Sequence, residues 1–111
     1  MAQGIEANGF VFAVTVPRDP HTLAIPDAFE GQARQAFDNL QAVLDAAGST
    51  MHDLVKLTIY LSDMGDWEAM NQVYLDYIDA ADPPCRCTVQ VARMHNDYMI
   101  ELDAVALPSS G

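Results

Sequence analysis

Arg86 is the residue whose position most strongly suggests chemistry in this sequence. The chain of 111 residues has only 5 Lys and Arg side chains against 16 Asp and Glu. Arg86 follows two prolines and opens a segment in which polar and apolar residues alternate. That period of two predicts a half-buried strand over residues 85–92. A guanidinium there could bind an anion, or it could form an ordinary ion pair with a carboxylate.

The strand expected over residues 98–107 would pair with this one as a hairpin. Alternation would then turn Cys87 toward the core and place the polar side chains of both strands together on the face away from the helices. Those side chains are Arg86, Thr88, Gln90, Glu101 and Asp103. This face is interpreted either as a hydrated surface with an ion pair or as a binding site, with Glu101 as the partner of Arg86.

Other candidate residues give weaker signals. Asn71 lies between predicted buried positions of a helix and is either a surface amide or a group that reaches a pocket. Trp67 is expected to belong to the core rather than to form a stacking platform. No metal site is expected, because the histidines show no metal-binding spacing. They are His21, His52 and His95.

Composition limits the class of protein. The net charge of −11 argues against nucleic acid and anionic membranes as partners, since phosphate binding needs Lys and Arg. No apolar run has the length of a membrane span, and no signal pattern occurs at the start. Cys85 and Cys87 are too far apart on an extended strand for a disulfide, so free thiols are expected. These features predict a single cytoplasmic domain over residues 1–111.

Seven elements must position these residues. Strands are predicted over residues 3–9, 10–16, 54–62, 85–92 and 98–107, and helices over residues 27–47 and from 63 or 66 to 80. The order is β-β-α-β-α-β-β, an α+β fold in which both amphipathic helices cover one face of a mixed sheet. The other face is either solvated or covered by a partner subunit.

Three local features refine this expectation. Residues 10–16 are almost continuously apolar, which predicts a strand buried on both faces. Asp27 is expected to cap the first helix. Gly48 is expected to end it, because it follows the last apolar position of the helical stripe.

Several segments together resemble the YjgF/RidA family. Residues 86–94 and 100–106 resemble its C-terminal signature, roughly R-[ST]-x-V-x-V-A-R-L followed by V-E-I-E-A-I-A. Residues 32–40 and 44–49 resemble its first helix, residues 55–64 its middle strand and residues 67–74 its second helix. The resemblance therefore covers nearly the whole chain.

The resemblance implies a chorismate-mutase-like fold and a homotrimer. The sheets would form a central barrel with helices outside and ligand sites between subunits. It also implies hydrolysis of reactive 2-imino and 2-enamino acids to 2-oxo acids and ammonia, with no cofactor. By position, Arg86 would bind the substrate carboxylate as a two-pronged fork, and Glu101 would position or activate the attacking water. Asn71 would line the cleft with Thr88, which stands where many members carry Cys.

Two departures concern the same site. We expect no counterpart of the family's G-P-Y-[SV]-Q-[AG] segment, whose Tyr lines the site, because no Tyr precedes Tyr60 in this sequence. The family's S-G-Q turn is replaced by residues 13–17, where the Thr15 hydroxyl could substitute for altered backbone donors. Two hypotheses remain: a deaminase with changed substrate range or rate, and a non-catalytic member that binds small carboxylates at subunit interfaces.

Overall fold

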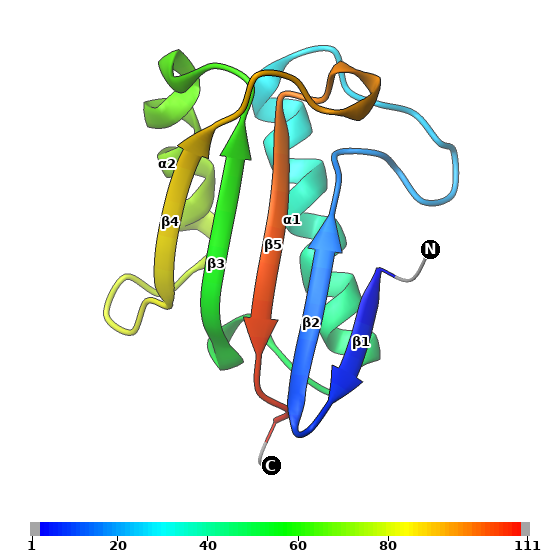
Figure 1. The fold of residues 1–111 in the computed structure, drawn as a ribbon, viewed down its shortest axis with the longest axis vertical. Coiled ribbons are helices and arrows are strands. Elements are labelled where there is room, and N and C mark those ends of the chain that lie inside the picture. The colour runs from blue at the N-terminus through cyan, green and yellow to red at the C-terminus, as the bar shows by residue number, and fades with distance from the viewer. Residues whose placement is uncertain (1–2, 110–111) are drawn as a thin grey trace.

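The computed structural model describes residues 3–109. Its elements follow the predicted order β-β-α-β-α-β-β (Figure 1). The strands are β1 (Gly4–Ala7), β2 (Phe10–Thr15), β3 (Leu54–Leu61), β4 (Cys85–Gln90) and β5 (Ile100–Ala106); the helices are α1 (Phe29–Ala46) and α2 (Trp67–Tyr77). Most boundaries lie within a few residues of those expected from the sequence.

The five strands form one mixed sheet in the order β1-β2-β5-β3-β4. β5 is antiparallel to both β2 and β3, whereas β4 is parallel to β3. The predicted hairpin of β4 and β5 is therefore wrong, because β3 lies between them. The reason is that α2 connects β3 to β4 as a crossover and so sets them side by side in parallel, which leaves β5 to pair on the other edge of β3.

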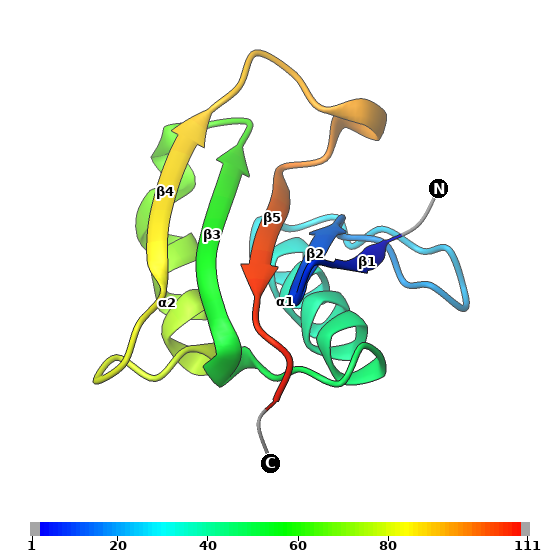
Figure 2. The same ribbon diagram turned by 60° about the horizontal axis from the view of Figure 1, so that its bottom comes forward.

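Both helices cover the same face of the sheet, as predicted. α1 lies behind β5 and β2, and α2 lies behind β3 and β4 (Figures 1 and 2). The core between the layers includes Phe37, Leu40, Leu57 and Leu102, which are fully buried. Burial of each such side chain contributes on the order of 2 kcal/mol. Within residues 3–109, no helix combines the length and the apolar character that a membrane crossing requires.

The C-terminal end of α1 confirms the role expected for Gly48. This residue has a φ of 76°, a left-handed conformation that Gly adopts without steric cost. The backbone N–H of Gly48 donates to the carbonyl of Asp45, and that of Ser49 donates to the carbonyl of Leu44. This is the Schellman arrangement, which satisfies carbonyls left open at a helix end. At the other end the prediction was wrong, because the N-cap is Ala28 rather than Asp27.

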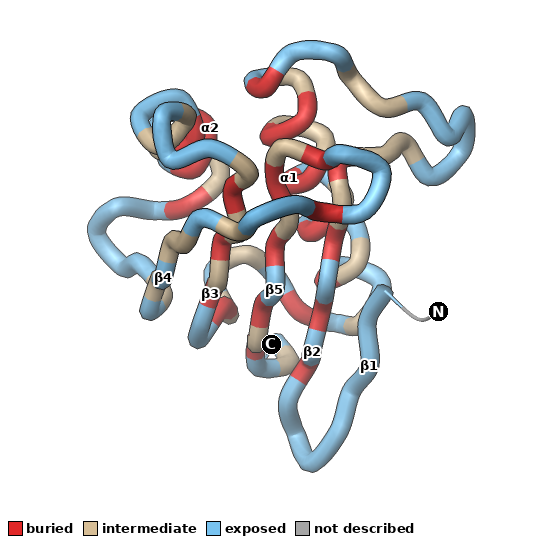
Figure 3. Tube along the Cα trace, turned by 45° about the horizontal axis from the view of Figure 1, so that its top comes forward, coloured by how far each residue is buried: buried red, intermediate tan, exposed pale blue. Residues whose placement is uncertain are grey.

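The face of the sheet away from the helices is open in the protomer. Along β2 and β5 buried positions alternate with less buried ones, while all of β1 is exposed (Figure 3). Phe10, Phe12 and Val14 of β2 point to the open face and are 41%, 46% and 47% exposed. Burial of β2 on both faces, as predicted, is therefore wrong within the protomer, since the helices cover only one face.

Candidate functional site

Arg86 and Thr88 lie on the helix-covered side of β4. They pair in register with Leu57 and Ile59 of β3, which are both fully buried beneath the helices. Because neighbouring residues in register point to the same face of a sheet, Arg86 and Thr88 face the helix layer. Cys87 lies on the opposite side and is exposed.

This arrangement reverses the predicted faces of β4. Alternation separates the two sides of a strand but does not say which one meets the helices. β4 is the edge strand of the sheet, so at the rim only α2 covers its helix side. On the helix side of β4, polar side chains that contact α2 can therefore take the place of apolar core residues. The expectation that Cys87 packs in the core was wrong, because Cys87 lies on the other side and is exposed.

The guanidinium of Arg86 is held by three side chains of α2. Its Nη1 donates to Oδ1 of Asn71 at 2.8 Å. Its Cζ lies 4.4 Å from the ring centroid of Tyr74 and 5.4 Å from that of Trp67, both within the range of cation–π attraction. Residues 67, 71 and 74 recur at steps of four and three, which places them on one face of a helix. The structure thus brings Arg86 and Asn71 together.

The charge of Arg86 is not neutralised by a carboxylate among the described residues. Arg34 pairs with Asp76 at 2.9 Å, and Arg93 pairs with Asp97 at 2.7 Å. No ion pair of Arg86 occurs within residues 3–109, where its partners are an amide and two rings. A guanidinium has five N–H donors, so donors of Arg86 stay available for an anion.

Thr88 is half-buried two residues beyond Arg86 on the same side of β4. Its hydroxyl oxygen is buried and has no hydrogen-bond partner in the described part of the chain. An unsatisfied buried hydroxyl costs about 1–3 kcal/mol. The hydroxyl is therefore a polar group without an evident structural role in the protomer.

Thr15, by contrast, has a clear structural partner. It is 2% exposed, and its hydroxyl donates to the carbonyl of Ala36 in α1 at 3.0 Å. β2 is separated from β4 by β5 and β3. The structure therefore does not bring Thr15 together with Arg86 within the protomer, and the hydroxyl faces α1.

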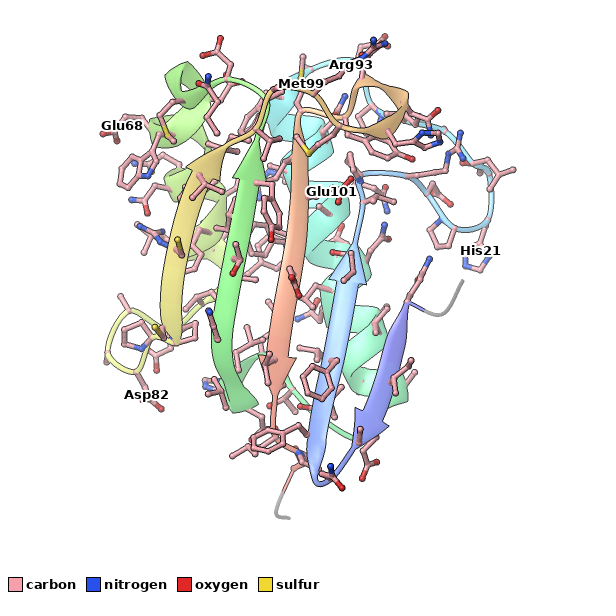
Figure 4. All side chains as sticks on the ribbon, viewed as in Figure 1. His21, Glu68, Asp82, Arg93, Met99 and Glu101 are labelled. Carbon is pink, nitrogen blue, oxygen red and sulfur yellow. The ribbon has the colours of Figure 1, made fainter. Side chains whose placement is uncertain are left out.

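Glu101 lies on the open face of the sheet, opposite to Arg86. It pairs in register with Tyr60, next to Ile59 and Leu61, which point into the core. Figure 4 shows Glu101 near the N-terminal end of β5, which begins directly after Met99. Partial burial raises the pKa of its carboxyl, and the nearby charge of His95 lowers this pKa by a smaller amount. The predicted pairing of Arg86 with Glu101 on one face is therefore wrong within the protomer.

The surface has hollows elsewhere, but their linings do not match these residues. One hollow of about 250 Å³ lies between α2 and the residues before β3, and its lining includes His52, Asp76, Asp79 and Asp82. Within residues 3–109, no cluster of three or more His, Cys, Asp or Glu side chains has the arrangement of a metal site. The cluster around Arg86 is therefore the arrangement best suited to bind an anion.

Sequence reasoning missed the contact of Trp67 and Tyr74 with Arg86. Trp67 was expected in the core and packs against it while only partly buried, whereas Tyr74 belongs to the buried core itself. The available signal was their spacing from Asn71 on a helix that leads into the strand carrying Arg86. Helical periodicity cannot separate a residue in the core from one at its rim.

The fold and this site define a class of protein. It is a small α+β protein with two helices on a mixed sheet, and at the sheet edge Arg86 has no ion-pair partner among the described residues. The family model described as Endoribonuclease L-PSP matches residues 2–108. The chain belongs to this family, which includes the YjgF and RidA proteins that the sequence resembles.

Relatives with informative names cover most of the chain. A RutC family protein from Synechocystis is 44% identical over 108 residues, 95% of this chain and 83% of the relative. The 2-iminobutanoate/2-iminopropanoate deaminase of Escherichia coli is 34% identical over 108 residues, 95% of this chain and 84% of the enzyme. The family therefore includes a named imine deaminase.

Solved structures confirm the fold. The crystal structure of Escherichia coli TdcF with bound serine matches with a TM-score of 0.90 and 34% identity, covering 98% of this chain and 88% of that one. A family member of this fold thus binds a small molecule that carries a carboxylate.

Proposed function

We propose that the protein hydrolyses reactive 2-imino or 2-enamino acids to 2-oxo acids and ammonia. The observation that carries this proposal is the Arg86 guanidinium, which Asn71 and two rings hold without neutralising it. A fixed, uncommitted guanidinium suits a carboxylate, the group that all these substrates share. The deaminase name of the Escherichia coli relative supports the reaction class.

The chemistry needs few groups. A protonated imine carbon is electrophilic, so water adds at C2 as it loses a proton to a base. The protonated base then returns this proton to the amino group of the adduct. The C–N bond breaks, its electron pair leaves with the nitrogen as ammonia, and the C2 hydroxyl loses its proton to become the new carbonyl. In this proposal Arg86 anchors the carboxylate and Glu101 accepts the proton of the water. Asn71 orients Arg86, and Thr88 lies beside the bound carboxylate.

The proposed site requires more than one protomer. Arg86 and Glu101 lie on opposite faces of the sheet, so one substrate can contact both only if they come from different subunits. The exposed apolar side chains of Phe10, Phe12 and Val14 support a subunit contact on the open face, because patches of this kind mark interaction sites. The resemblance to the YjgF/RidA family implies that this contact forms a homotrimer, and we include a homotrimer with sites between subunits in the proposal. Sizing should give three times the chain mass of 12.1 kDa.

The test generates 2-iminobutanoate in place with an amino-acid oxidase and times the release of 2-oxobutanoate. The protein should accelerate release, and Arg86→Ala should lower kcat/KM by about 100-fold, since two charge-assisted hydrogen bonds are lost. Arg93→Ala serves as the matched control and should keep full activity, because Arg93 is exposed and, among residues 3–109, forms its ion pair with Asp97. Release no faster than in buffer would overturn the proposal.

The second candidate function is binding of small carboxylates without turnover. The altered segment over residues 13–17 favours this candidate, because Thr15 faces α1 rather than the site. In that case 2-oxobutanoate would raise the melting temperature and Arg86→Ala would abolish the rise, while the imine assay showed no acceleration.

A further inference from the structure

We infer that Trp67 and Tyr74 are positioning residues that hold the guanidinium of Arg86 for a carboxylate while keeping its charge and donors free. This inference rests on the proposed function, because it assigns roles in the same site. It predicts that both rings raise the affinity for the carboxylate by holding Arg86, without forming hydrogen bonds to the carboxylate themselves.

One face of α2 holds the guanidinium of Arg86. Trp67, Asn71 and Tyr74 lie on one side of the helix and all contact the same guanidinium. Tyr74 is 5% exposed and packs edge-on against Phe37, with centroids 6.3 Å apart. The Tyr74 ring that contacts Arg86 is therefore fixed by the core, so the guanidinium packs against a rigid helix rather than a mobile loop.

The ring contacts of Arg86 differ chemically from the carboxylate contacts of other arginines. In this acidic chain Arg34 and Arg93 both use carboxylate partners, which consume N–H donors and cancel charge. A ring attracts a cation through its quadrupole and leaves the in-plane N–H donors unused. Only Nη1 is bonded to a described residue, Asn71. The rings thus restrict the side chain while the remaining donors stay free for the ligand.

The contacts with α2 also order the Arg86 side chain before the ligand binds. A free Arg side chain loses up to about 2 kcal/mol of rotamer entropy when it is fixed. Here that loss occurs on folding rather than on binding, which strengthens ligand affinity. Loss of one ring should therefore weaken carboxylate binding by roughly 5- to 10-fold, with a larger effect on KM than on kcat.

The test measures binding of 2-oxobutanoate by calorimetry to Trp67→Leu, Trp67→Phe and Tyr74→Phe. Trp67→Leu should raise Kd by roughly 5- to 10-fold, while the two variants that keep a ring should stay within about 3-fold of the wild type. Tyr77→Leu is the matched control on α2, because Tyr77 stacks on Phe37 and bonds to Asp38 rather than to Arg86. It should lower stability and leave Kd unchanged.

A further readout separates positioning from a general structural role. Trp67 is the single Trp of the chain, so its emission should shift when 2-oxobutanoate binds, and this shift should vanish in Arg86→Ala.

The outcomes distinguish this inference from the proposed function. If the wild type fails to bind 2-oxobutanoate, or Arg86→Ala binds it equally well, the proposed function itself is wrong. If Arg86→Ala abolishes binding while Trp67→Leu binds like the wild type, or Tyr77→Leu weakens binding as much as Trp67→Leu, only the positioning role is overturned.

Discussion

Arg86 and Glu101 lie on opposite faces of one sheet, although only β3 separates their strands. Arg86 is in register with Leu57 on the helix side, and Glu101 is in register with Tyr60 on the open side. The sheet itself thus separates the two groups that the proposed reaction requires. The proposed homotrimer would resolve this separation, since Glu101 of one subunit would meet Arg86 of the next.

Mixed trimers test this relationship. Arg86→Ala and Glu101→Gln should each have strongly reduced activity alone, but trimers refolded from equal amounts of both should recover about one quarter of the wild-type activity. The reason is that random assembly in a ring joins an intact Arg86 to an intact Glu101 at one contact in four. Activity is measured as release of 2-oxobutanoate. No recovery, in mixtures that form trimers by sizing, would place both groups in one subunit or remove one from the reaction.

The pH dependence of stability follows from Glu101. Partial burial raises the pKa of its carboxyl above the ordinary value of 4.5, so the folded state holds a proton that the unfolded chain releases. This contribution to stability is fully present below pH 4.5 and is lost as the pH rises through the folded pKa. Glu101→Gln should therefore be more stable than the wild type at pH 7, and the difference should shrink toward pH 4.

Urea unfolding at several pH values measures this effect. Asp103→Asn is the control, because it removes a carboxylate from an exposed position on the same face of β5. A Glu101→Gln variant that is less stable than the wild type at pH 7 would contradict the stated cause and indicate a favourable partner for the charged carboxylate.

The unsatisfied hydroxyl of Thr88 leads to a prediction on stability. Thr88→Val removes a buried polar atom that has no partner among the described residues and keeps the shape of the side chain. It should raise the free energy of unfolding by about 1 kcal/mol. Thr58→Val on the open face is the comparison and should change stability less.

The same variant tests whether Thr88 belongs to the site. If its hydroxyl bonds to the substrate, Thr88→Val should raise KM in the imine assay while the protein becomes more stable. A gain in stability with unchanged KM would remove Thr88 from the proposed site. A loss of stability would indicate that the hydroxyl has a bonding partner beyond the protomer.

Leu23 gives a prediction on backbone strain. This residue is 62% exposed and has a φ of 65°, a conformation that costs a side chain with Cβ about 1 kcal/mol or more. Leu23→Gly should therefore stabilise the protein by up to about 1 kcal/mol, measured by urea unfolding. Leu23→Ala keeps the strain and removes only the exposed side chain, so it should leave stability nearly unchanged. Equal stabilisation by both would show that strain is not the cause.

The sequence by itself determined the kinds and order of the elements. Apolar residues at helical spacing predicted the two helices, alternation predicted β3, β4 and β5, and a nearly continuous apolar run predicted β2. Each of these signals is local, because it lies within the residues of a single helix or strand. Gly48 marked the end of α1 for an equally local reason, since the left-handed conformation there favours Gly. The motif around Arg86 identified the family, and the two helices on one face followed from their apolar stripes.

Only the tertiary structure decided which strands are neighbours and which side of β4 meets the helices. Strand order depends on pairing between distant segments, so β3 could come between β4 and β5 without any local signal. At an edge strand the helix-facing side can be polar, and alternation alone then assigns the faces of Arg86 and Cys87 the wrong way round. The contacts of Trp67 and Tyr74 with Arg86, and its separation from Glu101, arise from packing between elements, which local pattern does not encode.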